Sequence, residues 1–198
     1  MSNTMNKPIL TIKNFRPDFH TKYQVTTIFM HVDECLTQKY YPIDFDVFLP
    51  SKGVNLQRAF VWTEQQSAEL IISILKGISI PAFSAIMLTN DKIDRNNRVI
   101  QIIDGKQRIM SIIKFIRDEF QITVNGYQYL YSELPSDLQY VVSGFHVTGN
   151  MMYQYTSDAT DEYNDNQKIE FFTHVNFAGT PQEQKHINLL TKLRSNEK

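Results

Sequence analysis

The residues best suited to chemistry form one short run, DGKQR, at positions 104–108. They follow the apolar, β-like run VIQII and precede the helical pattern IMSIIKFI, so they fall where a strand passes directly into a helix. The first turn of a helix has free backbone N–H groups and carries about half a positive charge. Lys106 and Arg108 add two cations there, although the helix dipole alone favours carboxylates. This arrangement predicts an anion site, with phosphate as the usual occupant.

Each residue type in this turn has an expected role. Asp104 is predicted to be the helix N-cap, with Gln107 at the third helical position reaching back to it. Gly105 is expected to let a ligand approach the backbone closely. The alternative is a capped surface helix whose lysine and arginine are merely solvated, and the pattern alone does not separate the two. The run is not a Walker A loop, because no glycine precedes it at the required spacing and Gln107 replaces Ser or Thr.

Composition places the chain among packed globular proteins. Its 198 residues are 42% hydrophobic, which suits one domain, or one domain with an appendage. The formal net charge of −1 gives no global basic field for nucleic acid but leaves room for a local basic site. Cys35 is the single cysteine, so an internal disulfide and a multi-cysteine zinc site are excluded. Without a signal-peptide pattern or a run of about 18 apolar residues, we expect a cytoplasmic protein with no membrane span.

Apolar periodicity outlines an α+β fold. Thr63 and Gln66 form a capping-box pattern that opens one helix, and Asn125-Gly126 is a strong hairpin signal. The acidic stretch 157–167 is predicted to be a mobile loop. The predicted helices cover residues 25–38, 63–77, 105–119, 133–143, 166–177 and 181–194. The predicted strands cover residues 41–49, 82–88, 99–103, 121–124, 127–131 and 146–156.

Several blocks together resemble the N-terminal domains of GmrSD-type restriction endonucleases, which belong to the ParB/sulfiredoxin-like superfamily. The segment IIDGKQRIMSIIKFI is similar to that family's Asp-Gly-Gln-Gln-Arg signature. LQRAFVWTEQQSAELIISILKGISIP resembles its opening block, ELPSDLQ a later segment, and FFTHVNFAGTPQEQKHINLL its closing block. In the family's order these blocks span about residues 55–193, which is most of the chain.

The resemblance implies a ParB/sulfiredoxin-like domain at residues 55–198, with a mixed sheet and a C-terminal helical pair, behind an N-terminal extension at 1–54. In such folds a strand–turn–helix junction binds nucleotide phosphates, in agreement with the anion site inferred above. Lys106 departs from the signature, because the family usually has Gln there; a lysine keeps phosphate affinity but lacks the amide acceptor. The resemblance therefore supports binding more strongly than hydrolysis. The residues that match the family's motifs are Asp104, Gly105, Gln107, Arg108, Gln57, Arg58 and Asn176.

The expected function is binding of a nucleoside triphosphate at the 104–108 turn, with hydrolysis as a further step. Asp104, Gln107 and Arg108 are the predicted catalytic residues, and Asp104 would hold Mg²⁺, the candidate metal cofactor, or the attacking water. Hydrolysis at such a site is positioning plus electrostatic stabilisation. The residues predicted to bind the nucleotide are Gln57, Arg58, Gly105, Lys106, Ser111 and Asn176.

Two alternatives stay open. One is a metal-dependent nuclease that nicks DNA at the same turn; Asp44 and Asp46 share a predicted strand face, but two carboxylates alone do not specify a metal site. The other is a non-catalytic module, encoded by a host or a phage, that regulates a DNA-processing or phage-defence system. DNA is thus a candidate partner. A partner protein would supply the nuclease or helical module into which many relatives of this family continue.

Arg58 is expected to converge with Lys106 and Arg108 on one concave phosphate site, since a planar guanidinium pairs bidentately with phosphate. The neighbouring aromatic residues, Phe60 and Trp62, are expected in the core, where large aromatic side chains are usually found. The five histidines of the chain show no metal-binding spacing and are expected to be structural.

Overall fold

In a computed structural model of the chain, the described residues are 25–31, 41–90, 94–155 and 160–177. Within them the fold is α+β, as predicted. The strands are β1 (Val25–His31), β2 (Ile43–Asp44), β3 (Phe48–Leu49), β4 (Val54–Asn55), β5 (Phe83–Asn90), β6 (Asp94–Asp104), β7 (Ile122–Val124), β8 (Tyr127–Tyr129) and β9 (His146–Tyr155). The helices are α4 (Glu64–Leu75), α5 (Lys106–Ile116), α6 (Ser136–Ser143) and α7 (Asp161–Phe177), with a short 3-10 turn η1 (Tyr131–Glu133).

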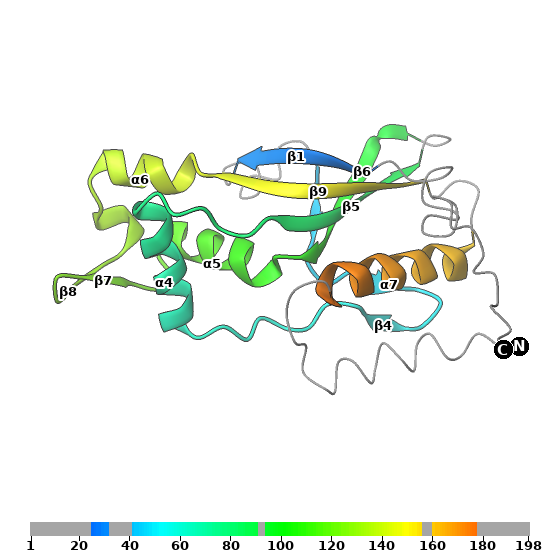
Figure 1. The fold of residues 1–198 in the computed structure, drawn as a ribbon, viewed down its shortest axis with the longest axis horizontal. Coiled ribbons are helices and arrows are strands. Elements are labelled where there is room, and N and C mark those ends of the chain that lie inside the picture. The colour runs from blue at the N-terminus through cyan, green and yellow to red at the C-terminus, as the bar shows by residue number, and fades with distance from the viewer. Residues whose placement is uncertain (1–24, 32–40, 91–93, 156–159, 178–198) are drawn as a thin grey trace, which may run out of the picture.

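One mixed sheet of five strands forms the centre of the molecule, in the order β1-β9-β5-β6-β2 (Figure 1). β5 pairs antiparallel with β6 and parallel with β9. At the edges, β1 pairs antiparallel with β9, and β2 pairs parallel with β6. β1 and β2 come from the predicted extension 1–54, so the sheet takes strands from both sides of the predicted boundary. The other described strands form two small hairpins, β3–β4 and β7–β8.

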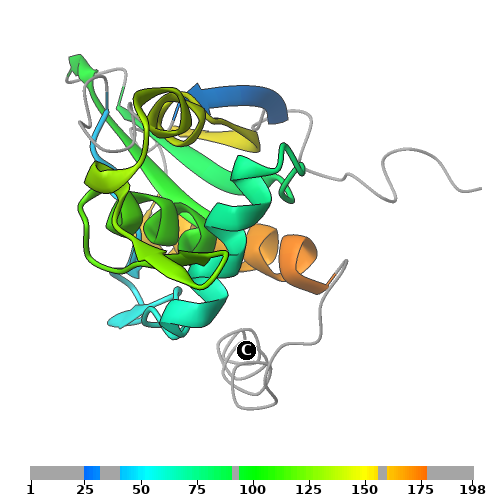
Figure 2. The ribbon, with the colours of Figure 1, turned by 90° about the vertical axis from the view of Figure 1, so that its left-hand side faces the viewer.

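Alternating side chains direct the two faces of the sheet into two apolar clusters. Along β5, Ala85 and Met87 belong to the cluster that packs against α4, α5 and α6, which lie toward the viewer in Figure 2. Ile86, between them, belongs to the cluster formed with α7 and the β3–β4 hairpin. The apolar residues Ile71, Ile74, Ile109 and Ile112 of α4 and α5 are buried, while Leu75 and Ile116 are half-buried.

Residues 25–31 form the strand β1, so the helix predicted over 25–38 was wrong for this part. Val25, Ile28 and Phe29 have a spacing that fits one face of a helix, but the segment is also rich in β-branched residues, which favour strands. β1 pairs with β9 along its whole length. That partner lies more than a hundred residues away in the sequence, and local spacing carries no information about it. The rest of the predicted helix lies outside the described residues.

The predicted strand 41–49 is interrupted. β2 joins the central sheet and β3 joins β4 instead, because the chain turns between them at Val47, whose φ is 52°. A continuous strand cannot pass through this left-handed conformation. In contrast, β6 is longer than the predicted strand 99–103, because its antiparallel pairing with β5 carries polar residues into the strand from Asp94 onward.

The stretch 157–167, predicted to be a mobile loop, contains the start of α7 at Asp161. The prediction was wrong there because the side chains that this end of the helix buries are polar. The sequence therefore lacks the apolar periodicity that would have indicated a helix. The helix predicted at 166–177 is confirmed as the later part of α7. Its predicted partner at 181–194 lies outside the described residues. The buried polar residues of α7 are Asn164, Asp165 and Lys168.

Local capping and turn signals were more reliable. Thr63 Oγ1 accepts from Gln66 N at 3.2 Å, and Gln66 Oε1 accepts from Thr63 N at 2.9 Å, which completes the predicted capping box at the start of α4. Asn125 and Gly126 have φ values of 51° and 84° and close the β7–β8 hairpin. Both conformations are those that an Asn-Gly hairpin turn requires.

Candidate functional site

The predicted site lies at the junction where β6 ends at Asp104 and α5 begins at Lys106. Gly105 is the N-cap, with φ 98°, so the prediction that Asp104 caps this helix was wrong. The left-handed glycine moves the cap one residue along the chain, and the Asp104 carboxylate instead accepts a hydrogen bond from Arg108 Nη2 at 2.9 Å. In the described part of the chain, no side chain caps the first turn of α5. Its leading N–H groups therefore have no side-chain acceptor.

Gly105 is required by packing. Its φ of 98° is strained for any other residue, and a Cβ built there would lie 2.8 Å from Cβ of Phe83. The space beside this glycine was predicted to admit a ligand, but Phe83 fills it on one side and the Arg108 guanidinium lies 3.2 Å from the same point. Close packing of α5 against β5 thus accounts for the glycine without a ligand.

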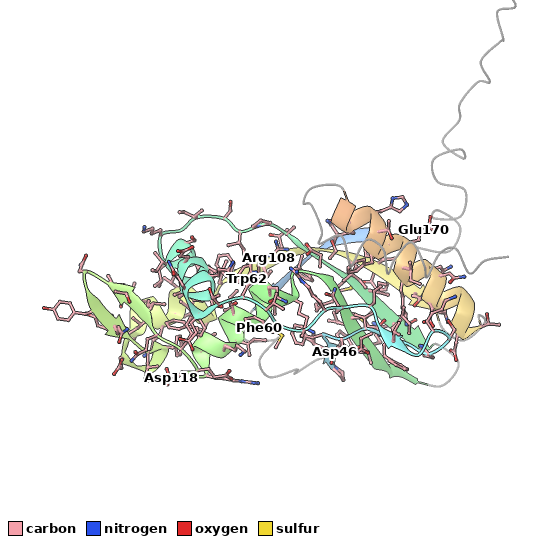
Figure 3. The ribbon with its side chains drawn as sticks, turned by 90° about the horizontal axis from the view of Figure 1, so that it is seen from below. Asp46, Phe60, Trp62, Arg108, Asp118 and Glu170 are labelled. Carbon is pink, nitrogen blue, oxygen red and sulfur yellow. The ribbon has the colours of Figure 1, made fainter. Side chains whose placement is uncertain are left out.

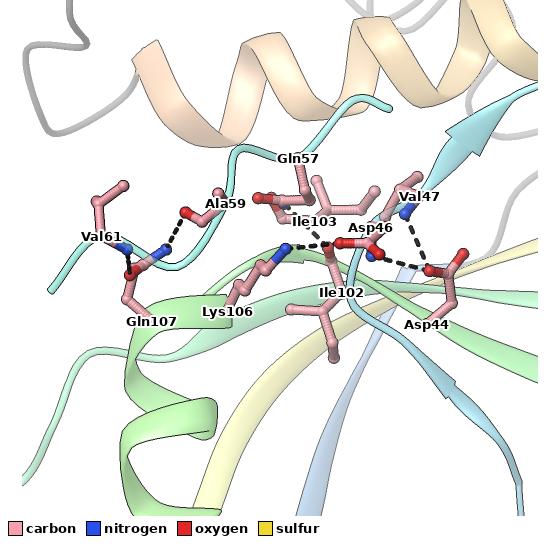
Figure 4. A network of polar contacts seen from close by, with 10 residues as sticks. All are labelled: Asp44, Asp46, Val47, Gln57, Ala59, Val61, Ile102, Ile103, Lys106 and Gln107. Carbon is pink, nitrogen blue, oxygen red and sulfur yellow. Dashed lines mark hydrogen bonds and ion pairs between the residues drawn. The ribbon is translucent and has the colours of Figure 1, made fainter. Parts of the chain in front are cut away.

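A short segment, residues 57–62, crosses the start of α5 and is called here the strap (Figure 4). Gln57 begins it and is half-buried. Its side-chain amide donates to the carbonyl of Ile102, at 2.9 Å, and to that of Ile103. Gln57 therefore fixes the strap to the end of β6, immediately before the candidate site.

Gln107 fixes the other part of the strap. Its Nε2 donates to Ala59 O at 3.1 Å, and its Oε1 accepts from Val61 N at 2.9 Å and from Trp62 N at 3.2 Å. The prediction that Gln107 reaches back to cap its own helix was therefore wrong. An amide can donate and accept at once, which is what two-sided contact with an extended backbone requires. Gln107 thus positions the strap relative to α5.

Lys106 is directed into the protein. Its side chain is 6% exposed, and Nζ donates to Asp46 Oδ1 at 2.8 Å, whereas the Asp46 side chain is 65% exposed. Asp46 is held in turn by its neighbour Asp44, whose Oδ1 accepts from Asp46 N at 2.8 Å and from Val47 N at 3.0 Å. The other oxygen of Asp44 accepts from Gln101 Nε2 on β6 at 2.9 Å. The sequence prediction missed this pair, because 60 positions separate Lys106 from Asp46 and no local pattern joins them.

Arg58 and Arg108 have different surroundings. Arg108 is 18% exposed and donates to Asp104 at 2.9 Å and to Ala82 O at 3.1 Å. Arg58 lies in the strap between the two anchored residues that flank it, and its side chain is exposed. Among the described residues it makes no hydrogen bond or ion pair. Lys106 and Arg108 are therefore neutralised by neighbouring carboxylates, and Arg58 is the cation that the strap leaves open to a ligand.

The aromatic residues of the strap are less exposed than Arg58 but are not fully buried. Phe60 and Trp62 are both half-buried, and Trp62 packs against the cluster formed with α4 and α5, as predicted for a core residue. Lys114, two turns along α5, places Nζ 4.7 Å from the centroid of the Phe60 ring, within range of a cation–π contact. Figure 3 shows both aromatic residues and Arg108 in the same part of the molecule, with Asp118 beyond the far end of α5.

The family described as "GmrSD restriction endonuclease, N-terminal domain" matches residues 54–190, which is more than half of the chain. The chain belongs to this family. Neither the curated proteins nor the solved structures gave a match. The matched region contains the strap, the end of β6 and α5, so the GmrSD assignment made from the DGKQR turn and its flanking blocks is confirmed.

Two further residues of the predicted nucleotide-binding set are on helices of this GmrSD N-terminal domain, Ser111 on α5 and Asn176 on α7. Ser111 is fully buried one turn further along α5, where its hydroxyl lies 2.9 Å from that of Ser67 on α4. We assign Ser111 to the contact between the two helices. Asn176 lies near the end of α7. Its side-chain placement is outside what the structure describes, so its role stays a prediction.

Within the described residues of this GmrSD N-terminal domain, no three or more His, Cys, Asp or Glu side chains come together as a metal-binding group. Within α7, His174 Nε2 lies 3.6 Å from Glu170 Oε1. Among the described helices, none has both the length and the apolar character needed to cross a bilayer.

Proposed function

We propose that this GmrSD N-terminal domain binds the phosphates of a nucleoside triphosphate at the start of α5, as part of a restriction-related DNA-processing system. The observation that carries the proposal is the uncapped first turn of α5, held by Gln107 to the strap, in which Arg58 is an exposed cation without a partner in the described residues. Free N–H groups and the helix dipole favour an anion at this end. A planar guanidinium adds a two-pronged contact with phosphate.

The strap supports the same proposal through positioning. Gln57 and Gln107 hold its two parts to β6 and α5, so the backbone that carries Arg58 is ordered before any ligand arrives. Ordering the binding elements in advance reduces the entropy lost when a ligand binds. The half-buried rings of Phe60 and Trp62 lie in the same segment and offer apolar surface for a base.

Hydrolysis is the less supported step. Asp104 offers a single carboxylate, 38% exposed and already paired with Arg108. Mg²⁺ is commonly bound by one or two carboxylates together with phosphate oxygens and water, so Asp104 fits as a ligand only when the nucleotide supplies others. When bound, Mg²⁺ would neutralise charge that develops on the phosphate oxygens. Gln107 is occupied by the strap, and in this arrangement it positions the site without touching the reacting atoms.

The test is calorimetric titration of the full chain with each of the four nucleoside triphosphates, with and without Mg²⁺, followed by measurement of phosphate release. Binding without release would indicate a switch or regulator, and release would indicate an NTPase. If nothing binds and the chain nicks DNA instead, the nuclease alternative replaces this proposal. If neither occurs, a non-catalytic interaction module is the better description.

Arg58→Ala should lower nucleotide affinity about ten- to a hundredfold, since a charge-assisted contact contributes about 1.5–3 kcal/mol. The matched control is Arg117→Ala, which removes an exposed arginine just beyond the opposite end of α5. Both variants should melt close to the wild-type temperature, because both side chains are exposed. Equal affinity of the two variants would remove Arg58 from the site.

A further inference from the structure

Asp46 stands between Lys106 and the solvent. The lysine side chain is 6% exposed, and its ammonium group is bound at 2.8 Å to a carboxylate that is itself 65% exposed. A phosphate at the start of α5 cannot form a direct hydrogen bond with Lys106 Nζ in the position that Asp46 Oδ1 now occupies. The ion pair with Asp46 therefore keeps the Lys106 ammonium group from contacting a phosphate.

The turn that carries Asp46 is clamped and strained at the same time. Asp44 accepts hydrogen bonds from the N–H groups of both Asp46 and Val47. Val47 has φ 52°, a left-handed conformation that β-branched residues rarely adopt. Backbone strain of this kind persists only where surrounding contacts enforce it, and it is concentrated at binding and switch regions.

The same turn is joined to the strap. Gln57 N donates to Asp46 O at 3.2 Å, and Leu56 N donates to Val47 O at 3.0 Å. The Asp46 turn thus lies beside the start of the strap, where Gln57 precedes Arg58 (Figure 4). The turn, the strap and the first turn of α5 form one connected unit.

We propose that Asp46 is a built-in competitor for the phosphate site, a carboxylate that holds Lys106 while the site is empty and must leave before Lys106 can bind phosphate. The inference rests on the proposed function, since it concerns regulation of the same site. A carboxylate and a phosphate compete for the same ammonium donors, and a buried lysine is unfavourable without one of them. The apparent affinity for phosphate is then low, because only the small fraction of molecules in which Asp46 has moved away can bind it through Lys106.

The test compares Asp46→Asn with Asp137→Asn, using inorganic triphosphate as the calorimetric probe for the full chain. Both substitutions remove one carboxylate charge, but Asp137 lies on α6 and is exposed. Asp46→Asn should tighten triphosphate binding by about tenfold or more. In wild type, the state in which Asp46 has moved away is expected to be a minor one, at about 10% or less, and the variant would no longer depend on that state. Asp137→Asn should change affinity less than about twofold, because exposed charges away from the site are screened by salt.

A second pair of variants separates release of Lys106 from a general gain in positive charge. In a Lys106→Met background, Asp46→Asn should give no more tightening than Asp137→Asn does. If the tenfold gain persists without Lys106, electrostatic attraction alone explains it and the competitor proposal is overturned. Should Asp46→Asn destabilise the fold, the increase in melting temperature on adding triphosphate remains decisive, because it should be larger in the variant than in wild type.

The outcomes distinguish this proposal from the one on which it rests. If wild type binds triphosphate and Asp46→Asn binds it no more tightly, Asp46 and Lys106 are a structural pair while the phosphate site stands. If neither wild type nor Asp46→Asn binds triphosphate or any nucleotide, the phosphate site itself fails and the competitor proposal fails with it.

Discussion

The helices α5 and α7 pack on opposite faces of the sheet, and among the described side chains α5 buries more apolar than polar residues, whereas α7 buries as many polar as apolar ones. Apolar burial is non-directional, whereas buried polar groups must meet particular partners. It follows that α5 is held mainly by packing, and that specific polar contacts set the position of α7. The residues buried by α5 are the apolar Ile109, Ile112, Ile113 and Phe115, together with the polar Lys106 and Ser111. Those buried by α7 are Ile169, Phe171 and Phe172, together with the polar residues Asn164, Asp165 and Lys168.

The polar layer under α7 connects it to two other elements. Asp165 is fully buried, and its Oδ2 accepts from both N and Oγ of Ser51, each at 2.8 Å, in the turn between β3 and β4. Gln154 on β9 donates to the backbone carbonyl of Asn164 at 3.0 Å. Lys168 Nζ lies 3.7 Å from Asp165 Oδ1. Burial lowers the pKa of Lys168, and the charge of Asp165 offsets part of that effect.

The largest effect is expected from breaking this layer. Asp165→Ala would leave Lys168 buried without its carboxylate and the two Ser51 donors without an acceptor. Removing one partner of a buried ion pair costs about 3–5 kcal/mol of unfolding free energy. Urea denaturation followed by circular dichroism would measure this cost.

A double variant gives the control. Asp165→Ala combined with Lys168→Met removes both charges, so it should be more stable than Asp165→Ala alone. If the single variant loses less than about 1 kcal/mol, which is an ordinary surface-level effect, α7 is held by its apolar residues and the contrast with α5 disappears.

On the α5 side, Ile112→Ala should lower the unfolding free energy by about 2–5 kcal/mol, because this fully buried side chain would leave a cavity. Urea denaturation followed by circular dichroism measures the loss of unfolding free energy. Ile112 and Asp165 belong to opposite faces of the sheet, so their costs should add to within about 0.5 kcal/mol. A large non-additive term would mean that the two helices are coupled through the sheet. Unchanged stability would mean that the helical register of α5 is wrong.

The two faces should also differ in their response to pH. Because the folded-state pKa of Lys168 is lowered, the unfolded chain binds more protons above that pKa, up to the ordinary lysine value of about 10.4. Stability should therefore rise with pH in this window, by at most about 1.4 kcal/mol per pH unit for one proton. Below the lowered pKa both states are protonated and the contribution is constant. Lys168→Met should flatten the rise, and an equal slope in both proteins would contradict the assignment.

The same contrast explains how much of the fold was predictable. The apolar stripe of α5, the capping box at Thr63 and the Asn125-Gly126 turn are local patterns, and each gave the correct element. β1 and the start of α7 depend on partners that are distant in the sequence, β9 in one case and Ser51 in the other. Their local sequence fits another conformation equally well. The spacing of apolar residues along the sequence does not predict pairing between distant strands or buried polar contacts.

At the candidate site the residue types were predictable and their partners were not. The strand–turn–helix junction at residues 104–108 and its place in the GmrSD family followed from the sequence. The contacts of Lys106 with Asp46 and of Gln107 with the strap connect positions 45 to 60 residues apart. These contacts change the interpretation, because they occupy two side chains that had been expected to face a ligand.

The smallest effect concerns Ser111, at the polar contact between α4 and α5. Its hydroxyl donates to Gln107 O at 2.8 Å, so Ser67 must donate across the 2.9 Å gap between the two serine hydroxyls. Ser111→Ala would leave the Ser67 hydroxyl without that acceptor. The expected cost is only about 1 kcal/mol, at the low end for a buried unpaired group, because a helical serine can rotate to its own i−4 carbonyl.

Replacing both serines with alanine should recover most of this loss, since no buried donor then lacks an acceptor. The decisive measurement is nucleotide affinity beside stability. If Ser111 serves only to pack α5 against α4, affinity stays at the wild-type value in the single and the double variant. A fall in affinity at unchanged stability would show that Ser111 reaches the ligand, and the α5 interface would then be part of the site instead of its scaffold.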